Sequence, residues 1–168
     1  CTPFHRIFAL DPETGEERWS YDPKVTYGPF KTRLKCLGVA YWEDEEASRD
    51  AACKHRVYVG TSDRRIISVD ARDGKPCESF GDGGQVDVNP IIARTPPVPE
   101  SHWGMVYSAP PVLVNDVLVI GSINNMKNQW PNAANGSTRG FDARTGEFLW
   151  DFDPVPRNPG DPEAANWD

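Results

Sequence analysis

An internal repeat constrains the fold of this chain more than any other feature of its sequence. Three segments each read as an alternating apolar strand, then Asp-x-x-(Thr/Asp)-Gly, then a second strand: residues 8–19, 67–77 and 139–150. The glycine supplies the positive φ that a tight turn needs, and the aspartate can accept hydrogen bonds from the turn amides. The repeat therefore predicts three β-hairpins within an all-β fold of repeated units.

Further strands precede two of these hairpins and complete a larger unit. Each pair consists of apolar strands joined by a short polar turn: residues 55–60 with 65–69, and residues 111–114 with 117–120. Trp19 and Trp150 occupy the second strand of the first and third hairpins, where a large apolar side chain suits a wedge between neighbouring sheets. Four-stranded sheets repeated in this way are typical of a β-propeller.

The predicted domain organisation is a partial propeller that extends over residues 1–168. We place the end of one blade at about 1–22, further blades at about 36–80 and 105–152, and a proline-rich connection at 153–168. About two and a half blades cannot close a ring, so we expect exposed strand edges and marginal stability for this segment alone.

Three loops lengthen the repeat. The acidic segment 43–50 lacks the alternating ligands and the glycine of a known calcium loop, which favours a solvated insertion. Residues 81–103 are rich in glycine, proline and polar side chains and are expected to cross between sheets. Residues 124–136 place many amide side chains beside a buried strand end, which makes this loop a candidate for function.

Composition and cysteine spacing exclude several classes of function. A net charge of −7 opposes the neutralisation of phosphates, so no nucleic-acid partner is expected. No apolar stretch approaches the length of a membrane span. The four cysteines allow three pairings if all are bridged, and the sequence does not choose among them. Neither they nor the three histidines have the spacing of a zinc site.

Seven motifs, in one order, carry a resemblance to a known family. They are Cys1-Thr2-Pro3; Ala9-Leu10-Asp11-x-x-Thr14-Gly15; Cys36-x-Gly38-Val39-Ala40-Tyr41-Trp42; Gly60-Thr61-x-Asp63; Gly74-Lys75-Pro76-Cys77-x-x-Phe80-Gly81; Ser108-Ala109-Pro110-Pro111; and Arg139-Gly140-Phe141-Asp142-Ala143-Arg144-Thr145-Gly146. The chain resembles the pyrroloquinoline-quinone-dependent dehydrogenases, and most of all their membrane-bound glucose, quinate and polyol branch.

This resemblance implies an eight-bladed propeller in the parent protein, of which the chain is an N-terminal portion. It further implies a quinone over the central axis, a calcium or magnesium ion beside it, and oxidation of a sugar or polyol hydroxyl. Electrons would pass to ubiquinone or a cytochrome from a periplasmic site. Attachment to the inner membrane would use a segment that is not present here.

Candidate site residues follow from the same resemblance. Ser108 and Ser122 are expected to contact pyrroloquinoline quinone, and His5 after the Cys-Thr-Pro motif is a further candidate contact. Either Asn124 or Asn125 could ligate the cation. We assign Asn125 as the metal ligand and count Asn124 among the cofactor contacts. The catalytic aspartate and the quinone-pairing lysine of the family lie in later blades, so no catalytic residue is named and the fragment alone is expected to be inactive.

Departures from the family pattern keep alternatives open. Leu37 stands where an arginine is expected to pair with a cofactor carboxylate, and Phe4 stands where the glucose branch has histidine. Asn125-Met126 replaces the common Asp-Asn at the metal position, so a charged ligand is missing. The chain could therefore belong to a propeller of the same lineage that has lost its cofactor and serves as a scaffold for protein interaction in the cell envelope. An interaction propeller of another lineage is a third reading.

Overall fold

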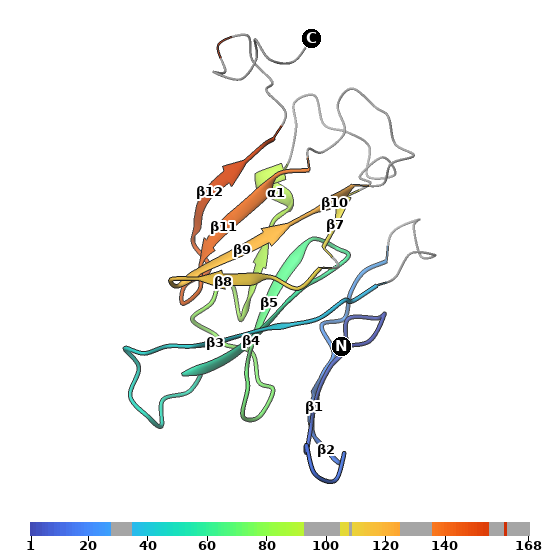
Figure 1. Cartoon of the computed structure of the whole chain (residues 1–168), viewed down its shortest axis with the longest axis vertical. Coiled ribbons are helices and arrows are strands. Elements are labelled where there is room, and N and C mark those ends of the chain that lie inside the picture. Colours follow the sequence, from blue (N-terminus) through green and yellow to red (C-terminus); the bar gives the residue numbers. More distant parts are fainter. Residues whose placement is uncertain (28–34, 93–104, 108, 125–135, 155–159, 161–168) are drawn as a thin grey trace.

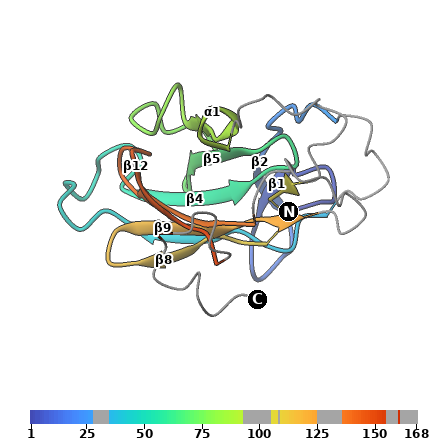
Figure 2. The same cartoon turned by 90° about the horizontal axis from the view of Figure 1, so that it is seen from above.

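The computed structural model describes residues 1–27, 35–92, 105–107, 109–124, 136–154 and 160. Within these ranges the chain consists of antiparallel strands and a single helical turn, α1 (Asn89–Ile92). Two four-stranded sheets lie as neighbouring layers, with a two-stranded hairpin beside them (Figures 1 and 2). The predicted all-β class is confirmed.

The first four-stranded sheet is a meander. Its strands are β3 (Ala40–Glu43), β4 (His55–Gly60), β5 (Arg65–Asp70) and β6 (Gln85–Asp87). β4 and β5 pair around residues 61–64, as predicted. Ile66 and Ile67 are both fully buried although successive side chains of a strand point to opposite faces. The sheet is therefore covered on both sides.

The second four-stranded sheet has the same topology. Its strands are β8 (Val112–Val114), β9 (Val117–Gly121), β11 (Thr138–Asp142) and β12 (Phe148–Phe152). Asn115 and Asp116 both have positive φ, which is the geometry of a two-residue turn that matches the twist of the paired strands. The edge strand β12 is exposed along its whole length.

Two short strand pairs complete the described part. β1 (Ile7–Leu10) and β2 (Glu17–Tyr21) form a hairpin, and Ile7 joins Val59, Ile67 and Val69 in a buried cluster. This cluster fixes the hairpin on one face of the first sheet. β7 (Met105–Val106) pairs with β10 (Ile123–Asn124) at the end of the sheets that includes the β4–β5 turn (Figure 1).

The repeated turn has the predicted chemistry in all three copies. Gly15, Gly74 and Gly146 have φ values of +74°, +73° and +77°. The aspartates Asp11, Asp70 and Asp142 each accept a hydrogen bond, through Oδ1, from the amide two residues further along the chain. Local sequence therefore determines these turns.

The middle repeat departs from the prediction after its turn. Residues 75–77 were expected to form a second strand, but Pro76 makes only an isolated bridge to Val69. A proline has no N–H to donate to a strand ladder, and the chain leaves β5 at this point. β6 pairs with the rest of β5 instead. The expected crossing segment 81–103 thus contributes a strand and α1 in its described portion.

The two tryptophans of the repeat occupy different surroundings. Trp19 packs against Gly74 in the turn that follows β5 of the first four-stranded sheet, and its Nε1 donates to the Ala71 carbonyl of the same turn at 3.0 Å. The prediction of a wedge between sheets is confirmed at this position. Trp150 lies over Gly140 of its own sheet and is 40% exposed. Among the described residues, Trp150 therefore has no neighbouring sheet to separate.

The acidic segment 43–50 is solvated except for one residue that joins the two sheets. Asp44 is buried and accepts two hydrogen bonds of 2.7 Å from the Arg144 guanidinium. The same guanidinium lies over the Trp42 ring, which itself donates to Asp116. The hydrogen bonds from Arg144 hold the pKa of Asp44 below its ordinary value. We call Asp44, Trp42 and Arg144 the inter-sheet latch.

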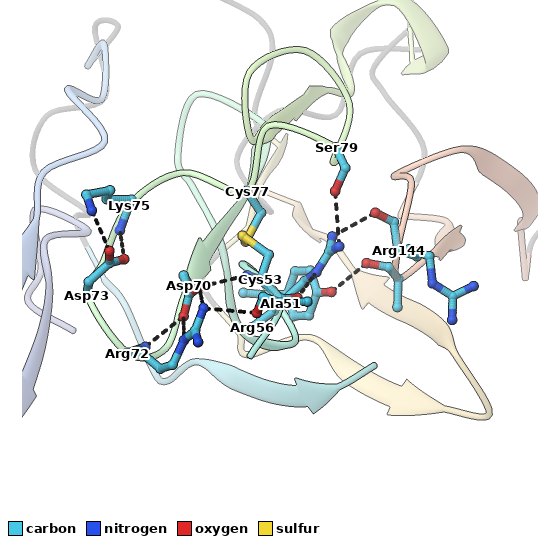
Figure 3. Close-up of a disulfide and its surroundings, with 12 residues drawn as sticks. Ala51, Cys53, Arg56, Asp70, Arg72, Asp73, Lys75, Cys77, Ser79 and Arg144 are labelled. Atoms are coloured by element: carbon cyan, nitrogen blue, oxygen red, sulfur yellow. Dashed lines mark hydrogen bonds and ion pairs between the residues drawn. A yellow bond between two sulfur atoms is a disulfide. The ribbon is translucent and has the colours of Figure 1, made fainter. Parts of the chain in front are cut away.

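Two disulfides resolve the choice that the sequence left open. Cys1 pairs with Cys36, and Cys53 pairs with Cys77. Figure 3 shows the second bridge within a polar network, where the Asp70 carboxylate accepts a hydrogen bond of 2.7 Å from the Cys53 amide. Arg56 donates to the carbonyls of Cys53 and of Arg144 in the second sheet. The second bridge therefore lies where the two sheets meet.

Candidate functional site

One end of the sheets collects the chain N-terminus, the β4–β5 turn and the β7–β10 pair. His5 Nε2 lies 2.8 Å from Ser62 Oγ, and the Tyr107 amide donates to the Thr61 carbonyl at 3.4 Å. These contacts join segments that are far apart in the sequence. We call this surface the strand-end face: residues 1–6, 36–38, 61–64, 105–107, 109–110 and 121–124.

The Cys1–Cys36 disulfide fixes one side of the strand-end face. It holds the two Cα atoms 5.9 Å apart, although the residues are separated by 35 positions in the chain. Gly38, two residues further on, lies against Pro110, because a Cβ built on Gly38 would be 3.3 Å from that ring. The motifs Cys36-x-Gly38 and Ala109-Pro110, distant in sequence, are thus in contact.

His5 is placed at this face but points into the protein. Its side chain is fully buried, and Nδ1 has no hydrogen-bond partner. Burial lowers the pKa of His5, while the charge of Asp63 opposes this shift. A neutral imidazole bonded to Ser62 joins the N-terminal segment to the β4–β5 turn. Its predicted contact with a cofactor stays a prediction.

Asp63 organises the β4–β5 turn. Its carboxylate accepts hydrogen bonds from Thr61 Oγ1, from the Arg65 guanidinium and from the Thr26 amide. Burial raises the pKa of Asp63, but these donors lower it further than burial raises it. The motif Gly60-Thr61-x-Asp63 therefore builds a rigid, charged support beneath the face.

Two further predicted site residues, Ser122 and Asn124, lie at the β9–β11 end of the face. Ser122 is half-buried, and its Oγ donates to the Ser137 carbonyl at 3.3 Å. The backbone of Asn124 belongs to β10, which pairs with β7. Ser108 and Asn125 lie outside the described residues. In the described ranges, no group of three or more His, Cys, Asp or Glu side chains is arranged to hold a metal ion.

Several buried polar atoms at this face have unused hydrogen-bonding capacity. They are Thr2 Oγ1, His5 Nδ1 and Tyr107 Oη. Buried polar atoms are normally paired, so each marks a place where a ligand or an ordered water would be stabilised. Burial also raises the pKa of Tyr107, which keeps its hydroxyl protonated. Tyr107 belongs to none of the predicted site residues; its position directly before Ser108 was the available signal.

Comparison with known proteins assigns this geometry to a family. The family model "PQQ: Glucose/ethanol/alcohol dehydrogenase, beta-propeller domain" matches residues 1–168. The chain belongs to this family. The resemblance found in the seven sequence motifs is therefore confirmed, and the two four-stranded sheets correspond to parts of a quinoprotein β-propeller.

Curated members of the family are similar over most of the chain. The quinoprotein glucose dehydrogenase of Escherichia coli (strain K12) is 33% identical over 163 residues, covering 95% of this chain and 20% of that protein. The glycerol dehydrogenase large subunit of Gluconobacter oxydans (strain 621H) is 34% identical over 155 residues, covering 91% of this chain and 20% of that protein. The chain thus spans about a fifth of the length of these relatives.

Solved structures agree on the fold. The quinohemoprotein alcohol dehydrogenase from Comamonas testosteroni has a TM-score of 0.65 and 23% identity, covering 95% of this chain and 20% of that chain. The alcohol dehydrogenase ADHIIG from Pseudomonas putida HK5 has a TM-score of 0.64 and 25% identity, covering 96% of this chain and 19% of that chain. The quinoprotein propeller is therefore the fold of this segment.

The strand-end face fits part of what a quinone cofactor needs. The contact between Gly38 and Pro110 forms an apolar surface, and the Ser122 hydroxyl belongs to the same face. Leu37, 63% exposed, offers no charge to a carboxylate of such a cofactor. An apolar surface suits a flat ring system, whereas a carboxylate needs donors from elsewhere in the protein.

Proposed function

We propose that this chain is the N-terminal part of the propeller of a quinoprotein dehydrogenase that oxidises a hydroxyl group of a sugar or polyol. The observation that carries the proposal is the family match over residues 1–168, together with relatives described as glucose, glycerol and quinate/shikimate dehydrogenases. Localisation in the periplasm, electron transfer to ubiquinone or a cytochrome, and a Ca²⁺ or Mg²⁺ ion beside the cofactor belong to the same proposal.

The cofactor would supply the redox chemistry, and this chain would supply a part of the cofactor-binding site. When bound, pyrroloquinoline quinone accepts two electrons and two protons from the substrate carbinol, which becomes a carbonyl group. Ser122 would donate a hydrogen bond to the cofactor in place of its bond to the Ser137 carbonyl. Gly38 and Pro110 would exclude water from one side of the ring. Ser108 and Asn124 are proposed as further contacts, and Asn125 as a cation ligand.

A second candidate function is a scaffold that binds no cofactor. Leu37 favours it, because an exposed leucine cannot pair with a carboxylate and a charge-assisted hydrogen bond contributes about 1.5–3 kcal/mol. Asn125-Met126 also favours the scaffold, because these two residues supply no charged ligand for a cation. In this case the propeller surfaces would serve protein interaction in the cell envelope.

Titration of the complete protein with pyrroloquinoline quinone distinguishes these functions. Protein prepared with Ca²⁺ or with Mg²⁺ is titrated by quenching of tryptophan fluorescence and then assayed for dye reduction with glucose, quinate and glycerol. Stoichiometric binding and turnover are expected of the dehydrogenase. Folded protein that binds no quinone with either cation at high micromolar concentrations contradicts the proposal and favours the scaffold.

A further inference from the structure

We infer that Arg139 is a positioning residue of the quinone site, because it keeps the Ser137 carbonyl hydrogen-bonded when the Ser122 hydroxyl turns from that carbonyl to the cofactor. This inference rests on the proposed dehydrogenase function and adds a residue to its binding site. Arg139 acts through the backbone acceptor that it shares with Ser122, and the role needs no contact between Arg139 and the cofactor.

The pairing of β9 with β11 brings these residues together. Thr138 pairs with Gly121 in the register of the two antiparallel strands, so Ser122 and Ser137 come opposite each other directly beyond this pair. Ser122 Oγ donates to the Ser137 carbonyl at 3.3 Å, and Arg139 Nη1 donates to the same oxygen at 3.3 Å. A carbonyl oxygen can accept two hydrogen bonds, so it accommodates both donors at once.

The two donors differ in charge and in freedom. Both hydrogen bonds are at the long end of the usual range, so neither is held by distance alone. The Arg139 guanidinium is permanently charged, and a charged donor forms the stronger hydrogen bond. Ser122 is half-buried, and its hydroxyl can rotate to another partner. Ser122 is therefore the exchangeable donor, and Arg139 is the permanent one.

Burial fixes the Arg139 side chain. Arg139 is 1% exposed and lies on the same face of β11 as Phe141, which belongs to the core shared by the two sheets. Its Nη2 lies 3.8 Å from a carboxylate oxygen of Asp151 in β12. Burial raises the pKa of the Tyr107 hydroxyl, and the nearby Arg139 charge opposes this rise. The guanidinium is thus held in place from β12 and from β7.

The shared acceptor makes ligand binding through Ser122 more favourable. Ser137 is fully buried, so water cannot replace a donor that its carbonyl loses. An unsatisfied buried acceptor costs free energy that corresponds to roughly a tenfold loss of affinity or more. With Arg139 present, the carbonyl keeps one hydrogen bond after the Ser122 hydroxyl leaves. Without Arg139, the hydroxyl must either stay on the carbonyl or leave it unsatisfied.

A double-mutant cycle in the complete protein tests this coupling. The dissociation constant of pyrroloquinoline quinone with Ca²⁺ is measured by quenching of tryptophan fluorescence for Ser122→Ala, Arg139→Met, the double variant and the unsubstituted protein. Each single variant should bind quinone roughly tenfold more weakly. The double variant should bind about as weakly as Ser122→Ala, because without the hydroxyl there is no exchange for Arg139 to support.

Thermal unfolding of the quinone-free protein gives a second readout that does not depend on the cofactor. The Ser137 carbonyl keeps one of its two donors in each single variant and loses both in the double variant. The double variant should therefore lose more stability than the sum of the two single variants. The coupling in stability is thus opposite in sign to the coupling in quinone affinity.

Arg56→Met provides a matched control. Arg56 is 3% exposed and donates to the carbonyls of Cys53 and Arg144, which do not belong to the strand-end face. This variant also removes a buried guanidinium, so it should lower stability but leave quinone affinity unchanged. If Arg139→Met does not fold, Arg139→Lys keeps the charge with a single ammonium group, and its coupling with Ser122→Ala should have the same sign and a smaller size.

The outcomes distinguish failure of the inference from failure of the proposed function. Additive losses of quinone affinity in the double variant, or unchanged affinity in either single variant, overturn the inference and leave the dehydrogenase standing. An equal loss of affinity in Arg56→Met assigns the effect to the fold as a whole and also overturns it. A folded complete protein that binds no quinone overturns the proposed function, and the inference with it.

Discussion

Gly15 and Gly74 have the same left-handed backbone in equivalent turns, but their surroundings differ. No atom lies within 4 Å of a Cβ built on Gly15, whereas a Cβ on Gly74 would be 2.6 Å from the Trp19 ring. Glycine is therefore required at position 15 for its positive φ alone, and at position 74 both for its positive φ and because a side chain would collide with Trp19. Only the requirement for a positive φ was visible in the sequence, because the tryptophan comes from another repeat.

Substitution of these two glycines tests the contact between repeats. Gly15→Ala is expected to cost about 1–2 kcal/mol through backbone strain alone. Gly74→Ala should cost about 1–3 kcal/mol more, because Trp19 must move. Urea unfolding followed by tryptophan fluorescence measures both variants. Equal losses would show that Trp19 adapts freely and that the contact is unimportant.

His5 predicts a dependence of stability on pH. Burial lowers its pKa in the folded state below the ordinary 6.5, so the unfolded state binds the proton first as pH falls. The free energy of unfolding should therefore decrease as pH falls through 6.5, and this contribution should level off below the folded-state pKa. The pKa of Asp63 is lowered in the folded state, so protonation of Asp63 decreases the free energy of unfolding only at more acidic pH.

The variant His5→Asn removes this titration while keeping a residue that tolerates the positive φ of 60° at this position. The free energy of unfolding, measured at pH 7.5, 6.5 and 5.5, should then be flatter than in the unsubstituted chain. An identical slope in both proteins would assign the acid sensitivity to another group.

At the scale of elements, the inter-sheet latch connects a loop to a turn 100 residues away in the chain. Arg144→Ala leaves the buried Asp44 carboxylate without its cation, and removes the guanidinium from the Trp42 ring. We expect a loss of about 2 kcal/mol, reduced from the cost of a fully buried pair because Arg144 is partly exposed.

The exposed pair of Arg18 and Asp11 provides a matched control for the latch. Arg18→Ala removes a similar ion pair within a single turn and is expected to leave the midpoint of urea unfolding unchanged. Arg144→Lys keeps the charge but loses the two-pronged contact, so it should fall between the unsubstituted chain and Arg144→Ala. A latch variant no less stable than the control would contradict this account.

The disulfides give a second prediction at this scale. Each closes a loop of tens of residues, at separations of 24 and 35, and is expected to contribute about 3–4 kcal/mol. Reductant should therefore lower the midpoint of urea unfolding of the natural chain. A Cys53→Ala/Cys77→Ala variant should start lower and lose only the contribution of the Cys1–Cys36 bridge. A midpoint that is insensitive to reductant would contradict the prediction.

Elements were predictable from the sequence where their contacts are local. The turns at Asp11, Asp70 and Asp142 follow from residues within five positions, and the strand pairs around 61–64 and 115–116 follow from short-range alternation. The truncated middle hairpin follows from Pro76, a local signal that the repeat pattern outweighed, whereas the disulfide pairing and the latch depend on residues from distant segments. The predicted roles of Ser108 and Asn125 depend on segments beyond the described ranges and stay predictions.

At the scale of the whole molecule, β12 leaves an apolar edge. Phe148, Leu149, Trp150 and Phe152 are all at least 40% exposed on this strand. Unpaired strand edges with apolar side chains promote association. A chain of residues 1–168 prepared alone is expected to associate at micromolar concentration in light scattering. Phe152→Lys should reduce the association, and a monodisperse monomer of the natural sequence would contradict this prediction.

Both disulfides join neighbouring parts of the chain: Cys53–Cys77 lies within the span of the first four-stranded sheet, and Cys1–Cys36 connects the segment before β1 to the segment before β3. Neither bridge needs a residue beyond position 77. Each bridge can therefore close once its own two cysteines are available, without waiting for the second four-stranded sheet. A ring that closes last would thus contain at least this segment with both of its bridges already formed.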